Sequence, residues 1–264
     1  MKRLVLDICS IVGKSAIRIG DLVIPASSVE STLHRYAKAL VCLNDHADFP
    51  YSIRGSMTSL RLRDRYFSIF CKHQISGFSP GQVGQFPRAE GGKFFICGGI
   101  FRDVLEDESN KDEEFSDVCA FEYNLAKYSM MNMHSEFFSV VENDCWPSNT
   151  LGHFILFGLP ANIQNLKVSC SDLDTKLEEI NFSTVVVTGN HVGRSHARWV
   201  QAGEMRRKAS FDADGMSGGP VFHLGRDSRG YFVGLAGMIM RGSSSSNRFH
   251  FVDSDFLRQF AESD

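Results

Sequence analysis

The chain has 264 residues, of which 43% are hydrophobic and 22% charged, and its formal net charge is −3. These values are ordinary for a soluble globular protein, and the nearly neutral balance excludes a general electrostatic attraction to nucleic acid. No apolar run reaches the roughly 18 residues of a membrane-spanning helix. We therefore expect neither nucleic acid nor a membrane among its partners.

The first fifty residues predict one strand and one helix. Residues 1–8 set basic residues before an apolar stretch, as a signal peptide does, but Asp7 and then Lys14 interrupt that stretch. We therefore expect a buried strand there. An N-cap pattern with an early acidic residue predicts a helix over residues 28–38.

Short apolar runs follow, mostly four to eight residues long and separated by Gly, Pro, Asn, Asp or Ser. This close spacing favours many short β-strands in a sandwich or barrel over alternating strands and helices. A closing helix is expected over residues 253–262, where apolar residues share one face. The predicted strands are residues 39–43, 59–62, 66–71, 93–97, 118–122, 154–157, 184–187, 220–223, 232–240 and 249–252.

Three polar stretches are predicted to be exposed loops. Residues 103–117 are acidic, residues 191–208 are basic, and residues 243–246 are consecutive serines. Runs of like charge are usually solvated, so we expect these stretches on the surface.

The seven cysteines are widely spaced and form no C-x-x-C pair. Zinc sites and compact disulfide frameworks need closer or paired spacing, so we expect neither a metal nor a disulfide framework. Reduced thiols predict a cytoplasmic location.

The segment Gly215-Met216-Ser217-Gly218-Gly219-Pro220 carries the most specific chemical signal. A serine hydroxyl is a weak nucleophile that needs a neighbouring base and backbone N–H groups aimed at the developing oxyanion. Glycines on either side let the backbone turn tightly around the serine and leave room for a substrate. The apolar run that begins at Pro220 predicts that this turn leads into a strand.

This segment resembles the G-x-S-G-G-P motif of the trypsin-like (chymotrypsin-fold) serine peptidases and matches each of its fixed positions. The resemblance implies that Ser217 is the nucleophile and that the N–H groups of Gly215 and Ser217 form the oxyanion hole. It also implies an all-β fold of two six-stranded antiparallel β-barrels with the catalytic residues in the cleft between them. A glycine-rich turn with an incidental serine is the alternative.

The family's chain order of His, Asp and Ser directs the search for a base upstream of Ser217. His73 follows the predicted strand 66–71, where the family has its histidine, and Gly55-Ser56-Met57 resembles the opening of the preceding strand. Cys71-Lys72 departs from the small residues that usually precede that histidine. A surface or core histidine without a role is the alternative.

Asp117 precedes an apolar run, residues 118–121, that is similar to the family's strand after its catalytic aspartate. A carboxylate there would hold the imidazole of His73 in one tautomer and stabilise the imidazolium. Asp103 and Asp112 are rivals, but no apolar run directly follows either of them. A strand-capping aspartate is the alternative role of Asp117.

The resemblance also implies a substrate pocket formed by residues shortly before Ser217 and in the strand after it. Asp212 favours a basic substrate side chain, whereas Phe211 and Met238 favour an apolar one, so the preference stays open. The implied pocket residues are Phe211, Asp212, Ala236, Gly237 and Met238.

Two further positions bear on regulation and specificity. Met216 stands where secreted zymogens of the family have an aspartate that pairs with a freed N-terminus. Activation by N-terminal cleavage is therefore not expected. His250 lies in a segment that resembles the last barrel strand, and either packs in the core or reaches into the pocket.

The sequence thus predicts a serine endopeptidase that cleaves a protein or peptide substrate through an acyl-enzyme, without a cofactor. His73 would act first as general base and then as general acid. The two expected units are residues 1–135 and residues 136–264. A regulatory partner protein is expected to release a loop, either residues 103–117 or residues 191–208, that holds the site closed.

Two other functions stay open. A catalytically silent barrel would serve as a protein-binding module. The serine segment also satisfies G-x-S-x-G, the nucleophile elbow of esterases, with Asp227 and His250 as the only sensible acid and base after it. That elbow leads into a helix, whereas residues 219–222 predict a strand.

Overall fold

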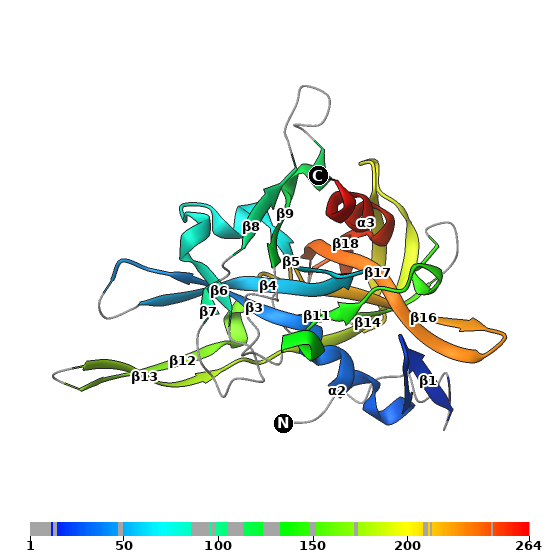
Figure 1. The fold of residues 1–264 in the computed structure, drawn as a ribbon, viewed down its shortest axis with the longest axis horizontal. Helices are drawn as coiled ribbons and strands as arrows, with labels where there is room; N and C mark the ends of the chain where they lie inside the picture. The colour runs from blue at the N-terminus through cyan, green and yellow to red at the C-terminus, as the bar shows by residue number, and fades with distance from the viewer. Residues whose placement is uncertain are drawn as a thin grey trace.

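The chain is almost entirely β-structure, arranged in two main sheets and one separate ribbon (Figure 1). For residues 95–96, 133, 165–171 and 174–181 the backbone alone is described. The computed structural model describes residues 12, 15–46, 50–85, 95–96, 99–104, 113–123, 133–147, 152–171, 174–207, 211, 213–243 and 245–263.

The C-terminal sheet closes on itself as a six-stranded antiparallel barrel, because β16 pairs with both β11 and β17. Its strands in spatial order are β16 (Pro220–Asp227), β11 (His153–Gly158), β14 (Val185–Arg194), β15 (Val200–Met205), β18 (Arg248–Asp253) and β17 (Gly230–Ser243). Two strands from the N-terminal region extend this sheet. β1 (Ala16–Ile19) pairs in parallel with β17, and β2 (Leu22–Pro25) pairs with β1.

Aromatic side chains fill the barrel. Phe249 and Phe251 alternate along β18 toward the inside, where both are fully buried and contact Phe154 of β11. Each buried phenylalanine removes about 150–250 Å² from water, so these rings dominate the packing of this core. Gly189 and Gly203 face the ring of Phe249, and a Cβ atom at either position would overlap that ring.

The N-terminal sheet curls into a half-barrel, which remains open among the described strands. Among the described strands its two edges are β7 and β8, which do not pair with each other. β10 (Phe138–Ser139) pairs in parallel with β4. The strands in spatial order are β7 (Phe95–Ile96), β6 (Val83–Gln85), β3 (Ala37–Leu43), β4 (Tyr51–Leu62), β5 (Arg65–Cys71), β9 (Val118–Tyr123) and β8 (Ile100–Asp103).

Helical structure consists of short connections and one terminal helix. α3 (Ser254–Glu262) begins where the Asp253 side chain accepts a hydrogen bond from the N–H of Phe256, and its apolar face is buried. The other helical elements are α2 (Val29–Leu33) and the 3₁₀ turns η1 (Ala26–Ser28), η2 (His34–Tyr36), η3 (Lys72–Ile75), η4 (Pro80–Gln82), η6 (Glu114–Asp117), η8 (Met133–Glu136), η9 (Glu142–Asp144) and η10 (Ala161–Ile163).

One antiparallel ribbon stands apart from both sheets. β12 (Asn165–Ser171) and β13 (Asp174–Asn181) pair with each other and with no other described strand. Figure 1 shows this ribbon projecting far from the body of the molecule.

The structure confirms the all-β class and the closing helix, and each strand predicted from the apolar runs coincides with an observed strand. The helix predicted over residues 28–38 is shorter, because β3 already begins at Ala37. The predicted strand in residues 1–8 lies outside the described residues. The expected units 1–135 and 136–264 remain a prediction.

The expected loop over residues 191–208 is wrong for most of its length. β14 continues to Arg194, and β15 forms a strand of the closed barrel. The charged residues around β15 misled the prediction, and its buried positions include a glycine and a glutamine beside Val200 and Met205. Gly203 leaves room for the ring of Phe249, and Gln201 is buried with its amide donating to Asp253.

Among the residues that the structure describes, no helix has the length and apolar character needed to cross a bilayer. Four cysteines with described side chains are free thiols: Cys42, Cys71, Cys119 and Cys145.

Candidate functional site

The register between β5 and β9 brings His73 and Asp117 together. Cys71, the last residue of β5, pairs with Val118, the first residue of β9. Their neighbours beyond the strand ends therefore lie side by side, on turns η3 and η6. Asp117 Oδ1 accepts a hydrogen bond of 2.9 Å from the backbone N–H of His73, which fixes the carboxylate against the turn.

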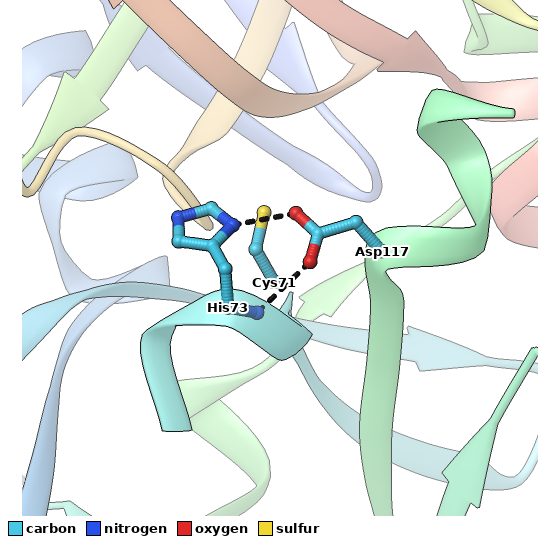
Figure 2. A group of neighbouring side chains, drawn as sticks. All are labelled: Cys71, His73 and Asp117. Carbon is cyan, nitrogen blue, oxygen red and sulfur yellow. Dashed lines mark hydrogen bonds and ion pairs between the residues drawn. The ribbon is translucent and has the colours of Figure 1, made fainter. Parts of the chain in front are cut away.

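The second carboxylate oxygen engages the imidazole. Asp117 Oδ2 lies 2.6 Å from Nδ1 of His73. A carboxylate only accepts hydrogen bonds, so Nδ1 carries the proton and the neutral ring has an unprotonated Nε2. Figure 2 shows Nδ1 pointing at Asp117 and the other ring nitrogen facing away from it. Because the His73 side chain is 54% exposed, Nε2 can reach a group outside this pair.

Asp117 also sets the protonation behaviour of His73. The pKa of His73 is raised above its ordinary value of 6.5, chiefly by the hydrogen bond to Asp117. Partial burial opposes this rise, and the negative charges of Asp117 and Asp214 add to it. The site therefore favours an imidazolium, which is the state that a base reaches after it takes a proton.

The turn that carries Ser217 is held through its backbone carbonyl groups by the N-terminal half of the chain. The hydroxyl of Ser56 donates to Gly215 O at 2.7 Å, and the hydroxyl of Thr58 donates to Gly218 O at 2.7 Å. Ser217 O accepts from the side-chain amide of Gln74 at 2.9 Å. Gln74 directly follows His73, so this bond joins the serine turn to the histidine turn.

The backbone N–H groups of Gly215 and Ser217 are not engaged in the same way. Among the described residues, none accepts a hydrogen bond from the N–H of Gly215 or of Ser217. Gly215 has φ +86° and Gly218 has φ +84°, a region that glycine adopts without steric cost. The glycines thus allow a turn whose carbonyls face the protein and whose two amides remain available.

The hydroxyl of Ser217 is bonded to a backbone carbonyl. Its Oγ donates to the carbonyl oxygen of Met240 on β17 at 2.8 Å. The structure brings together His73 and Asp117 by direct bonds, and it brings the backbone of Ser217 against Gln74. It shows no hydrogen bond between Ser217 Oγ and His73.

Cys71, His73 and Asp117 have their ligand atoms within 4.8 Å of one another, a grouping of metal-binding residue types (Figure 2). Cys71 is completely buried, and burial raises the pKa of its thiol well above the ordinary value of 9.0. A metal needs the thiolate, and Nδ1 of His73 is already bonded to Asp117. We therefore assign these residues to the histidine–aspartate pair and not to a metal centre.

The residues implied for the substrate pocket lie in different surroundings. Ala236 and Met238 are fully buried on β17, and Gly237 between them packs against β18, where a Cβ atom would overlap the carbonyl of Val252. Phe211 is half-buried against the barrel core. Asp212 lies outside the described residues. Their role in a pocket remains a prediction.

Met216 is buried in the core of the closed barrel, with its sulfur against Gly158. His250 pairs with Arg241 across β17 and β18, and its Nδ1 is buried without a hydrogen-bond partner among the described residues. Burial lowers the pKa of His250, and the nearby charge of Arg241 adds to this effect.

Asp103, the rival of Asp117 that the structure describes, has another partner. Asp103 forms an ion pair of 2.9 Å with Lys72, and Asp112 lies outside the described residues. The esterase alternative lacks its helix, because Pro220 opens strand β16. Its candidate acid, Asp227, is bound by Arg18 and Arg229.

Sequence reasoning missed four residues that hold the serine turn: Ser56, Thr58, Gln74 and Met240. Ser56 and Thr58 sit at alternate positions of a buried strand, which could have suggested polar contacts inside the protein. Met240 acts through its backbone carbonyl, and for that role a side chain gives no signal.

No protein-family model matches the chain, and no curated protein matches it either. Among solved structures, the inactivated protease paralogue S-I1 of the scabies mite aligns with a TM-score of 0.51 and 9% identity, over 86% of this chain and 94% of that one. A structure concerned with the disordered VPg protein of Sesbania mosaic virus aligns with a TM-score of 0.46 and 13% identity, over 94% of this chain and 95% of the other. The first likeness shows a fold shared with a protease paralogue.

Proposed function

We propose that this chain is a serine endopeptidase that cleaves peptide bonds of a protein or peptide substrate. Ser217 is the nucleophile, His73 the general base, and Asp117 the residue that orients the imidazole. The observation that carries this proposal is the pair of hydrogen bonds by which Asp117 fixes both the backbone N–H and Nδ1 of His73. That pair leaves Nε2 as a proton acceptor, and Gln74, the residue after His73, bonds the glycine-flanked serine turn.

The proposed reaction has two stages. In the first, Ser217 Oγ attacks the substrate carbonyl carbon while its proton moves to Nε2 of His73. The N–H groups of Gly215 and Ser217 stabilise the oxyanion, and the imidazolium gives its proton to the leaving amine. In the second stage, water loses a proton to Nε2 and attacks the acyl-enzyme, which releases the new carboxyl group and restores the Ser217 hydroxyl.

This reaction requires the Ser217 hydroxyl to leave Met240 O and turn toward His73. We propose that a rotation about the serine χ1 torsion, which has three staggered wells, makes this change. Catalytic hydrogen bonds are often formed only after substrate binds, so the bond to Met240 O suits a resting enzyme. The same bond also favours a second candidate function, a catalytically silent barrel that binds protein.

A fluorophosphonate probe distinguishes these two functions, because it forms a covalent bond only with an activated serine. We expect mass spectrometry of the probe-treated chain to find one adduct on Ser217. The adduct should disappear in Ser217→Ala and in His73→Ala. Ser59→Ala, which changes a buried serine hydroxyl without a partner among the described residues, is the matched control and should keep it.

A folded chain that takes no label would overturn the enzyme proposal and support the binding module. Labelling that persists in Ser217→Ala would overturn the choice of nucleophile. If the wild-type chain takes the label, the unlabelled wild-type chain should cleave a peptide library and yield new amino termini. These termini would define the preferred residue before the cleaved bond.

A further inference from the structure

The side chain of Gln74 forms hydrogen bonds both to its own turn, next to His73, and to the serine turn. It is 4% exposed and caps turn η3, where its Oε1 accepts from the N–H of Cys71 at 2.7 Å. Its Nε2 donates to Ser217 O at 2.9 Å and to Ser56 O at 3.2 Å. A primary amide has two N–H donors, so these two carbonyls, with Arg54 O at 3.5 Å as a third acceptor, use both of them.

The network also fixes which way the amide faces. Oε1 lies against an N–H group and Nε2 lies against carbonyl oxygens, so the reversed amide would lose all of these bonds. Arg54 closes the arrangement, because its Nε donates to the Gln74 carbonyl at 3.1 Å. The residue after His73 is thus held in one rotamer by both its side chain and its backbone.

Two glycines make room for this amide. A Cβ atom at Gly55 would overlap Nε2 of Gln74, and a Cβ atom at Gly218 would lie 2.9 Å from its Oε1. Gly55 has φ +134° and Gly218 has φ +84°, so both also need the backbone freedom of glycine. The amide therefore occupies a slot between the strand β4 and the serine turn that only glycines leave open.

We infer that Gln74 is a positioning residue, which sets where the Ser217 turn lies relative to the imidazole of His73. This inference rests on the proposed function. Asp117 controls the orientation of His73 within the N-terminal sheet, whereas Gln74 controls the alignment of that sheet's histidine with the serine of the other sheet. A displacement of about 1 Å between reacting groups can lower a rate by about 100-fold.

The test uses three variants of the full chain. Gln74→Leu removes every polar bond of the side chain, and Gln74→Glu keeps the acceptor for Cys71 N but turns a carboxylate toward two carbonyls. Gln82→Leu is the matched control. Gln82 caps the turn η4 with the same geometry as Gln74 caps η3, but its amide reaches Leu43 O and not the serine turn.

Fluorophosphonate inactivation gives a maximal rate and a probe affinity for each variant. We expect both Gln74 variants to lose about 10- to 100-fold in the maximal rate with little change in affinity, because alignment and not binding is altered. The pH at which His73 titrates, followed by NMR, should stay at the wild-type value in Gln74→Leu, since Asp117 still bonds Nδ1. Gln82→Leu should match the wild type in both measurements.

Maximal rates of the Gln74 variants within about twofold of that of Gln82→Leu would overturn the inference and leave the proposed function intact. A wild-type chain that takes no label would instead overturn the proposed function. If Gln74→Leu does not fold, Gln74→Glu provides the same comparison, because it retains the cap of turn η3.

Discussion

The histidine side and the serine side of the candidate site are built in different ways. His73 and Asp117 belong to one sheet, and direct side-chain bonds align them before any ligand arrives. Ser217 belongs to the other sheet, and its turn is aligned through carbonyl groups by side chains of the first. The acid and the base are therefore aligned within one sheet, whereas the alignment of the base with the nucleophile depends on contacts between the two sheets.

The largest expected effect comes from breaking the histidine side. Asp117→Asn keeps the size of the side chain but lets it donate to Nδ1, which favours the wrong tautomer of His73. We expect the fluorophosphonate labelling rate of Ser217 to fall by about 10,000-fold. Asp103→Asn is the control, since Asp103 pairs with Lys72 and not with the imidazole. An equal loss in both variants would contradict the special role of Asp117.

The pH dependence of Ser217 labelling tests the same pairing of His73 with Asp117. Only neutral His73 can accept the serine proton, so labelling should rise as pH increases through the pKa of His73. Because the Asp117 hydrogen bond raises that pKa, we expect the midpoint above 6.5 in the wild type. The midpoint should move to lower pH in Asp117→Asn, where the imidazolium loses its negatively charged partner. A midpoint unaffected by this substitution would contradict the proposed pairing.

Breaking the serine side should cost stability as well as reactivity. The buried Ser56 hydroxyl donates to Gly215 O and accepts from Leu159 N. Ser56→Ala leaves both groups without a partner, so we expect a loss of about 1–3 kcal/mol in the free energy of unfolding. Urea denaturation measures this value. Ser59→Ala removes a buried hydroxyl without a partner among the described residues and should not lower stability, because no hydrogen bond is lost.

The smallest expected effect concerns an ion pair that links the two sides. Arg241 follows Met240 on β17 and binds Glu114 of turn η6 through two hydrogen bonds, of 3.2 and 2.7 Å. The pair is largely exposed, so a double-mutant cycle with Glu114→Gln and Arg241→Gln should give a coupling of about 0.2–1 kcal/mol. We expect this coupling to decrease at high salt. A coupling that persists in 1 M salt would contradict a screened surface pair.

Each strand predicted from the apolar runs coincides with an observed one, because short apolar runs separated by turn residues report burial directly. Other strands were not predicted, among them β1, β2, β6, β8, β10, β12 and β13. The closing helix was also predictable, and its N-cap is Asp253, the first residue of the predicted range. The stretch around β15 was missed because its charged residues hid a strand whose buried positions include Gly203 and Gln201. Periodicity cannot identify a strand that contributes few apolar side chains to the core.

The site was predictable only in part. A serine between glycines, and a histidine and an aspartate at the ends of apolar runs, are features of single segments. The bonds from Gln74 and Ser56 to the serine turn join residues that are far apart in the chain, and no spacing of residues in the sequence predicts them. The bond from Ser217 Oγ to Met240 O depends on the backbone path of β17, which only the fold determines.

Because the Gln74 amide occupies the slot between Gly55 and Gly218, substitutions at these three positions depend on one another. Alanine at Gly55 would collide with the Gln74 amide, and a shorter side chain at position 74 would remove this collision but not the strain of the positive φ. A lineage that passes through the shorter side chain would first lose the link between the histidine and serine turns. Any new link, whether another polar side chain or a covalent bond, would have to arise from that weakened intermediate, which restricts the order in which these residues can change.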